Sequence, residues 1–127
     1  MSVIQRNEKM RIGGQKISGD AGSLEVFNPY KNEVVGTVPR ASRGQVQHAL
    51  QIAKDFKPKL TRYERQQILT KTAQLLVARR DEISDLITAE SGLSKKDSLY
   101  EVGRAFDVFS LAGQLCILDD SQIFSCD

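Results

Sequence analysis

LEVFNPYKNEVVGTVP, residues 24–39, is the stretch that decides the fold of the first part of the chain. It contains two runs of β-branched and aromatic residues, at 24–27 and 34–38, on either side of a turn rich in Asn and Pro. Such side chains favour strands, while Asn-Pro and Lys-Asn pairs favour turns. The stretch therefore predicts a β-hairpin whose second strand is closed by Pro39.

The residues before this hairpin have the same strand-and-turn character. Short apolar pieces at residues 11–12 and 16–17 are divided by Gly13 and Gly14. Glycine supplies the backbone conformations that tight turns require. The first 40 residues are therefore predicted to be strands and turns.

From Ser42 onward the apolar residues follow helical spacing instead. The first helix carries them at Val46, Ala49, Leu50, Ala53 and Phe56. Ser42 is its predicted N-cap and Pro58 its stop. A second predicted helix begins with the capping box Thr61 and Glu64. It runs to Gly92, because glycine tolerates the left-handed conformation that follows a helix C-terminus.

A second capping box, Ser98 with Glu101, predicts the start of a third helix. Its apolar stripe consists of Leu99, Val102, Phe106, Phe109, Gly113 and Cys116. Beyond this helix, residues 122–126 favour the start of a strand.

These elements predict an α/β fold with strands and a hairpin over residues 1–40, three helices over 42–118 and the start of a strand over 121–127. A lone hairpin and a lone terminal strand leave unpaired edges, which stable proteins cover or blunt. We therefore expect residues 1–127 to form one incomplete domain that further sequence completes.

Composition and charge argue against several classes of protein. The 127 residues carry 18 basic and 16 acidic side chains, interleaved along the chain, for a formal net charge of +2. Nucleic-acid-binding proteins gather positive charge on one face, so no nucleic-acid partner is expected. No apolar run approaches the roughly 18 residues needed to cross a bilayer, and the N-terminus has no apolar signal segment. We expect a cytoplasmic protein without a membrane partner.

Side chains typical of catalytic sites are few. With one histidine and no CxxC spacing, a Cys/His zinc site is not expected. We expect His48 to face solvent, and Cys116 and Cys126 to be partly buried thiols. No glycine-rich phosphate loop is present in the sequence. The acidic cluster Asp81, Glu82, Asp85 and Glu90 alternates with basic residues and is expected to form a solvated helix face.

Arg104 has surroundings that suit a ligand contact. It follows Glu101 at i+3, so the two side chains can pair along a helix. Gly103 and Ala105 leave little side chain on either side, so a ligand could approach the backbone closely. A guanidinium grips a phosphate or phosphonate group through two parallel hydrogen bonds. The residues alone leave both roles open: an intrahelical pair or an anion contact.

Four segments taken together resemble the aldehyde dehydrogenase superfamily. They are EVFNPYKNEVVGTVPRAS (25–42), VQHALQIAK (46–54), LTRYERQQILTKTAQLLVARRDEISDLITAESGLSKKDS (60–98) and EVGRAFDVFSLAG (101–113). They match in order and spacing, and the resemblance covers residues 11–127. The stretch ESGLSKKDSLYEVGRA, residues 90–105, is most similar to members of the family that act on phosphonoacetaldehyde.

The resemblance implies the N-terminal part of a dinucleotide-binding domain, in an enzyme that oxidises an aldehyde to its carboxylic acid with NAD or NADP. The last helix would line the substrate tunnel, with Arg104 facing the anionic end of the substrate and with Leu99 and Phe106 flanking it. The substrate would be a small aldehyde with a phosphonate or phosphate group, phosphonoacetaldehyde being the expected example. The intact enzyme would form homo-oligomers.

The resemblance also implies that this segment carries no catalytic residue. The nucleophilic cysteine, the general-base glutamate, the oxyanion-hole asparagine and the cofactor-binding residues would all follow residue 127. Neither Cys116 nor Cys126 matches the context of the nucleophile. The chain alone is therefore expected to be inactive.

Two other interpretations stay open. The chain could be a complete helical module without catalytic activity that binds a protein partner through a strand edge. Alternatively, it could belong to an enzyme of the same family with another aldehyde substrate, which would differ only in what the tunnel accepts.

Overall fold

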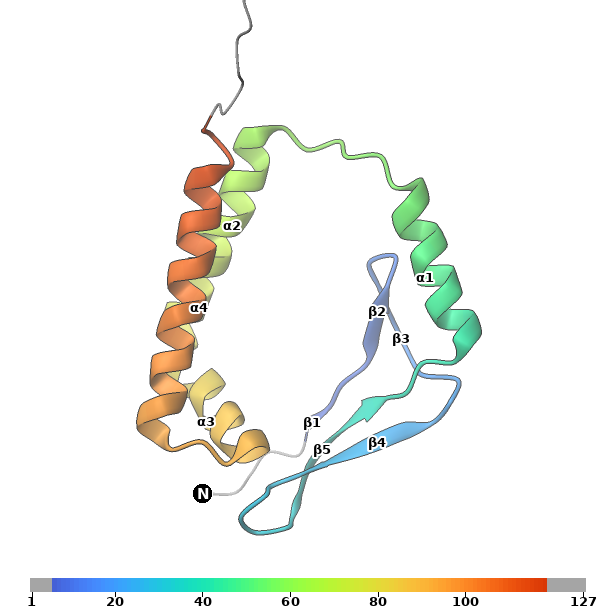
Figure 1. The fold of residues 1–127 in the computed structure, drawn as a ribbon, viewed down its shortest axis with the longest axis vertical. Coiled ribbons are helices and arrows are strands. Elements are labelled where there is room, and N and C mark those ends of the chain that lie inside the picture. The colour runs from blue at the N-terminus through green and yellow to red at the C-terminus, as the bar shows by residue number, and fades with distance from the viewer. Residues whose placement is uncertain (1–5, 119–127) are drawn as a thin grey trace, which may run out of the picture. The chain divides into compact units, whose positions relative to one another are not determined.

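The computed structural model describes residues 6–118 (Figure 1). The strands are β1 (Arg6–Asn7), β2 (Met10–Ile12), β3 (Gln15–Ile17), β4 (Ser23–Phe27) and β5 (Val34–Pro39). The helices are α1 (Arg43–Asp55), α2 (Arg62–Ala78), α3 (Arg80–Ser91) and α4 (Lys95–Leu115). These elements confirm the predicted α/β fold class. The predicted strand at 121–127, and Cys126 within it, lie outside the described residues.

Strands β4 and β5 form the predicted hairpin. Asn28 fastens its turn, because its Oδ1 accepts hydrogen bonds from the backbone N–H groups of Tyr30 and Lys31 at 3.0 and 2.9 Å. β1 pairs with β5 in the parallel direction, which gives a three-stranded sheet in the order β1-β5-β4. A separate two-stranded hairpin, β2 with β3, turns at Gly13-Gly14, where φ is +58° and +81°. Glycines suit this two-residue turn because both positions need positive φ.

Helices α1 and α2 begin at the predicted N-caps. Ser42 Oγ accepts the N–H of Gln45 at 3.3 Å, and Gln45 Oε1 accepts the N–H of Ser42 at 3.0 Å. Thr61 Oγ1 accepts the N–H of Glu64 at 3.2 Å, and Glu64 Oε2 accepts the N–H of Thr61 at 2.7 Å. Both arrangements are reciprocal capping boxes, which satisfy backbone donors that a helix start otherwise leaves without partners.

The helix predicted between Thr61 and Gly92 is interrupted. α2 ends at Ala78, and Arg79 has φ −110° and ψ 21°, which is not helical geometry. α3 then begins at Arg80. Apolar spacing continues across this junction without a Gly or Pro, so the sequence pattern gave no sign of the break. The described part of the chain therefore has four helices rather than the predicted three.

Helix α4 begins earlier than predicted, and its cap is Ser94 rather than Ser98. Ser94 Oγ accepts the N–H of Asp97 at 3.2 Å and donates to Asp97 Oδ2 at 2.8 Å. Ser98 is buried inside the helix, and its hydroxyl is hydrogen-bonded to the Thr88 hydroxyl of α3 at 2.8 Å. The prediction was wrong because a serine followed three residues later by an acidic residue occurs twice, at Ser94 and at Ser98. The second serine is buried and bonded to Thr88, so it does not cap the helix.

The chain divides into two compact units, Met1–Pro58 with Asp85–Ser98 and Lys59–Ser84 with Leu99–Asp127. In the first unit, Val35 of β5 is buried. In the second, Ala73 of α2 and Val102 of α4 are buried, and Gly113 of α4 lies close to Leu69 of α2. The second unit is therefore a pair of packed helices (Figure 1).

Many large apolar side chains lie outside these small cores. Those exposed on the helices include Leu50, Ile68, Leu75, Val77, Val108, Leu111 and Leu115. Despite this apolar content, none of the described helices is long and apolar enough to cross a membrane.

Gly92 supplies the predicted left-handed residue after α3, with φ +75°. A Cβ at this position would stand 2.8 Å from Pro29 Cγ. We expect Gly92→Ala to lower the free energy of unfolding by about 2 kcal/mol or more, because the left-handed conformation alone costs a non-glycine residue about 1–2 kcal/mol. Urea denaturation of the chain measures this.

Gly22→Ala is the matched control for this test. Gly22 also has positive φ, +91°, but a Cβ there would meet nothing within 4 Å. Gly22→Ala should lower the free energy of unfolding only by the cost of placing a non-glycine residue in the left-handed conformation. Equal losses in the two variants would show that Pro29 yields to the added methyl group.

Glu64 gives the capping box of α2 a pH dependence. Hydrogen bonds from the backbone N–H and the hydroxyl of Thr61 lower the pKa of Glu64 below its ordinary value of 4.5, because they stabilise the carboxylate. A pKa that is lower in the folded state adds stability above the unfolded-state pKa, and this stability is lost as pH falls through the folded-state pKa.

We therefore expect Glu64→Gln to flatten the acid limb of a stability profile recorded by urea denaturation between pH 3 and pH 7. The equivalent box of α1 uses the neutral side chain of Gln45, so Gln45→Ala should lower stability equally across that range. Parallel profiles for the wild type and Glu64→Gln would contradict the prediction.

Candidate functional site

Arg104 lies on α4 with an exposed side chain. Its Nη1 donates a hydrogen bond to Glu101 Oε1 at 3.3 Å, and the two side chains are 63% and 43% exposed. This is the intrahelical pair that the i+3 spacing indicated. A Cβ built on the neighbouring Gly103 would meet no atom within 4 Å. Among the described residues, the space beside the backbone at Gly103 is therefore open.

Leu99 and Phe106 do not share the face of α4 that carries Arg104. A helix turns about 100° per residue, which puts Leu99 and Phe106 within about 20° of each other. Arg104 lies about 140° from Leu99 and about 160° from Phe106 around the axis. Leu99 is half-buried and Phe106 is at the edge of exposure. The three predicted site residues therefore do not form one cluster on the helix.

The residues that share a face with Arg104 are Tyr100, Val108 and Leu111, at i−4, i+4 and i+7. All three are exposed, at 68%, 64% and 57%. They were not among the predicted site residues, because the prediction followed the apolar stripe on the other side of α4. The signal was available, since helical spacing from Arg104 leads directly to these apolar positions. The candidate site, named here the Arg104 face, is Arg104 with these three side chains.

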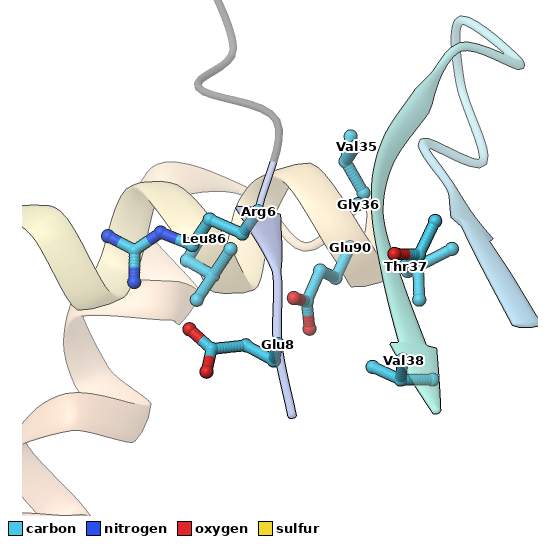
Figure 2. Close-up of a pocket in the computed structure, with 9 residues that line it drawn as sticks. Arg6, Glu8, Val35, Gly36, Thr37, Val38, Leu86 and Glu90 are labelled. Carbon is cyan, nitrogen blue, oxygen red and sulfur yellow. The ribbon is translucent and has the colours of Figure 1, made fainter. Parts of the chain in front are cut away.

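A shallow hollow in the first unit is a second place where a ligand could be considered (Figure 2). It lies between the sheet and α3, and its lining includes Arg6, Glu8, Gly36, Thr37, Leu86 and Glu90. Its lining contains two carboxylates, of Glu8 and Glu90, and one guanidinium, of Arg6, so the lining is acidic overall. An anionic substrate would be repelled by that charge, and none of the predicted site residues lines the hollow.

The remaining candidates are on the surface, as the sequence indicated. His48 is exposed, and Cys116 is a free, half-buried thiol. The acidic cluster on α3 is exposed, and its members pair with basic neighbours: Glu82 with Arg79 and Asp85 with Lys95. These contacts agree with the solvated helix face that was predicted.

The helix N-termini in residues 6–118 do not suit the pyrophosphate of a dinucleotide. A phosphate binds at a helix start through free backbone N–H groups. The starts of α1, α2 and α4 are instead closed by the side chains of Ser42, Thr61 and Ser94. α3 has two acidic residues in its first turn, which would repel a phosphate. None of the described helix starts therefore presents an uncapped, uncharged N-terminus to a phosphate.

Comparison with known proteins shows that the chain is similar to several dehydrogenases that act on aldehydes. The lactaldehyde dehydrogenase of Methanococcus aeolicus is 32% identical over 91% of this chain and 27% of its own length. The malonate-semialdehyde dehydrogenase of Halalkalibacterium halodurans is 35% identical over 88% of this chain and 24% of its own. The chain thus spans about a quarter of the length of these relatives.

Solved structures agree with the sequence relatives. Aldehyde dehydrogenase 21 from Physcomitrella patens, in complex with its reaction product succinate, is 31% identical with a TM-score of 0.82, over 87% of this chain and 24% of that chain. An NAD-dependent aldehyde dehydrogenase from Sinorhizobium meliloti is 27% identical with a TM-score of 0.80, over 88% of this chain and 24% of that chain. Residues 16–127 also match the model of the aldehyde dehydrogenase family. The chain belongs to the aldehyde dehydrogenase family.

Proposed function

We propose that the protein to which these residues belong is an NAD(P)-dependent dehydrogenase that oxidises a small anionic aldehyde to its carboxylic acid. Phosphonoacetaldehyde is the substrate that we propose first. The observation that carries the proposal is the exposed guanidinium of Arg104, which makes one hydrogen bond, to Glu101, from a single Nη, next to the exposed apolar side chains of Val108 and Leu111.

The chemistry of the Arg104 face suits a short substrate with one charged end. The guanidinium can offer two parallel hydrogen bonds to a phosphonate, sulfonate or carboxylate. Val108 and Leu111 would lie against the uncharged part of such a molecule. Binding energy gained at the anionic end can then be used to orient the aldehyde carbon. In this proposal Arg104 binds and positions the substrate, and it takes no part in bond breaking.

The relatives support an anionic substrate without identifying it. Malonate semialdehyde carries a carboxylate opposite its aldehyde, and succinate, the product bound to the Physcomitrella patens enzyme, keeps a second carboxylate. Lactaldehyde has no charged group, so membership of the family does not by itself set the charge of the substrate. The phosphonate is proposed from the resemblance of residues 90–105 to enzymes that act on phosphonoacetaldehyde.

The other parts of the activity are proposed for residues outside this chain. We expect the nucleophile, the general base and the cofactor site to lie there, and the 127-residue chain alone to lack activity. We also propose that the whole enzyme forms homo-oligomers. Leu99 and Phe106 stay predicted tunnel residues, although their side of α4 is turned away from the Arg104 face.

Arg104→Ala tests the proposal in a full-length dehydrogenase that carries residues 1–127 as its N-terminal part. We expect the KM for phosphonoacetaldehyde to rise about 10- to 100-fold, because hydrogen bonds to charged groups contribute about 1.5–3 kcal/mol and 1.4 kcal/mol corresponds to tenfold. The KM for propanal, which has no charge, should change less than about twofold. Steady-state assays with both aldehydes measure the ratio of the KM for phosphonoacetaldehyde to the KM for propanal, in the wild type and in the variant.

Arg79→Ala is the control for a general loss of positive charge. Arg79 is also an exposed arginine paired with a glutamate three residues away. Its replacement should leave the ratio of the two KM values unchanged. Equal effects of Arg104→Ala on both aldehydes would refute the proposed role of Arg104.

A further inference from the structure

Glu101 accepts the hydrogen bond that the Arg104 guanidinium makes along α4. We propose that Glu101 is an internal competitor for the anionic group of the substrate, and that its carboxylate must leave the guanidinium before the substrate binds. The proposal rests on the proposed function, since it assumes that Arg104 contacts the substrate. It assigns Glu101 a part in specificity and none in catalysis.

The geometry of the pair indicates a contact that is easily exchanged. The chain contains a second arginine–glutamate pair at the same spacing, Arg79 with Glu82. There the Nε and Nη2 atoms donate two hydrogen bonds, both of 2.8 Å, to the two carboxylate oxygens. These bonds are tight enough to raise the pKa of Arg79. Arg104 by contrast makes one hydrogen bond of 3.3 Å to a single oxygen of Glu101.

This single contact leaves most of the guanidinium available. An arginine has five N–H donors in a fixed fork, and a bidentate anion uses two of them. A loose, exposed pair at i,i+3 contributes little to helix stability. A substrate that makes two bonds would therefore displace the carboxylate, whereas a weakly bound anion would not. While Arg104 is paired with Glu101, the two opposite charges balance, and the site does not present an unpaired positive charge to other anions.

Glu101→Gln in the full-length dehydrogenase is the test, with phosphonoacetaldehyde and propanal as the two probes. Because the competing charge is removed, the KM for phosphonoacetaldehyde should fall about two- to fivefold. The kcat and the KM for propanal should each change less than about twofold. Glu101→Ala keeps the helix and should give the same direction of change if the glutamine variant folds poorly.

Asp107→Asn is the matched control for charge alone. Asp107 lies three residues after Arg104, as Glu101 lies three residues before it, and it makes no hydrogen bond to Arg104 among the described residues. Both substitutions remove one negative charge at the same spacing. A smaller effect of Asp107→Asn supports competition through the hydrogen bond, and an equal effect overturns it.

The background of Arg104→Gln separates the two proposals. If Glu101 acts through Arg104, adding Glu101→Gln to this background should have no further effect on the KM for phosphonoacetaldehyde. If Arg104→Gln raises that KM but Glu101→Gln leaves it unchanged or raises it, the role of Glu101 is refuted and the role of Arg104 stands. If Arg104→Gln leaves the ratio between the two aldehydes unchanged, the proposed function fails, and the role of Glu101 fails with it.

Discussion

The burial of one face of α4 is the constraint on which the candidate site depends. Ser98, Val102 and Gly113 lie on that face and are buried. A helix is rigid about its axis, so burying these three positions decides where all the others point. Arg104 is turned outward as a result, together with the apolar residues one turn before and after it. The side chains on the buried face therefore determine the direction of the side chain proposed to bind substrate.

The same helix explains why the described residues expose so much apolar surface. α4 has Val102 on one side and Val108 and Leu111 on the other, so it is apolar on both. A helix of this kind is usually covered on both sides. Residues 6–118 cover one side only, and α2, with Ala73 buried but Leu75 exposed, has the same character. Exposed apolar surface on this scale is typical of an interaction surface.

Local signals were sufficient to predict much of the fold. The hairpin at 24–39, the caps at Ser42 and Thr61 and the glycine after α3 each depend on a few neighbouring residues, and each was found. The break at Arg79 and the start of α4 were not. The start of α4 depends on the burial of Ser98 against Thr88, ten residues away, which a short window does not contain. The break at Arg79 is not marked by a Gly or Pro, and Arg79 pairs with Glu82 across the junction.

The candidate site was only partly predictable for a related reason. The unusual position of an arginine among small residues was visible in the sequence. Which face of the helix it occupies depends on what the opposite face packs against, and that is a property of the folded chain. The apolar stripe that was predicted is mainly the packing side of α4, and the assignment of Leu99 and Phe106 to the tunnel stays a prediction.

The close approach of Gly92 to Pro29 has a consequence for how the protein is made. The turn that contains Pro29 leaves the ribosome early, but the glycine that lies against it is added about 60 residues later, which at about 5–20 residues per second takes roughly 3–12 s. During that interval the hairpin has no helix end against its turn. All strands of the sheet β1-β5-β4 are made by residue 39, so this small sheet must hold its turn without the contact to Gly92 until α3 is complete.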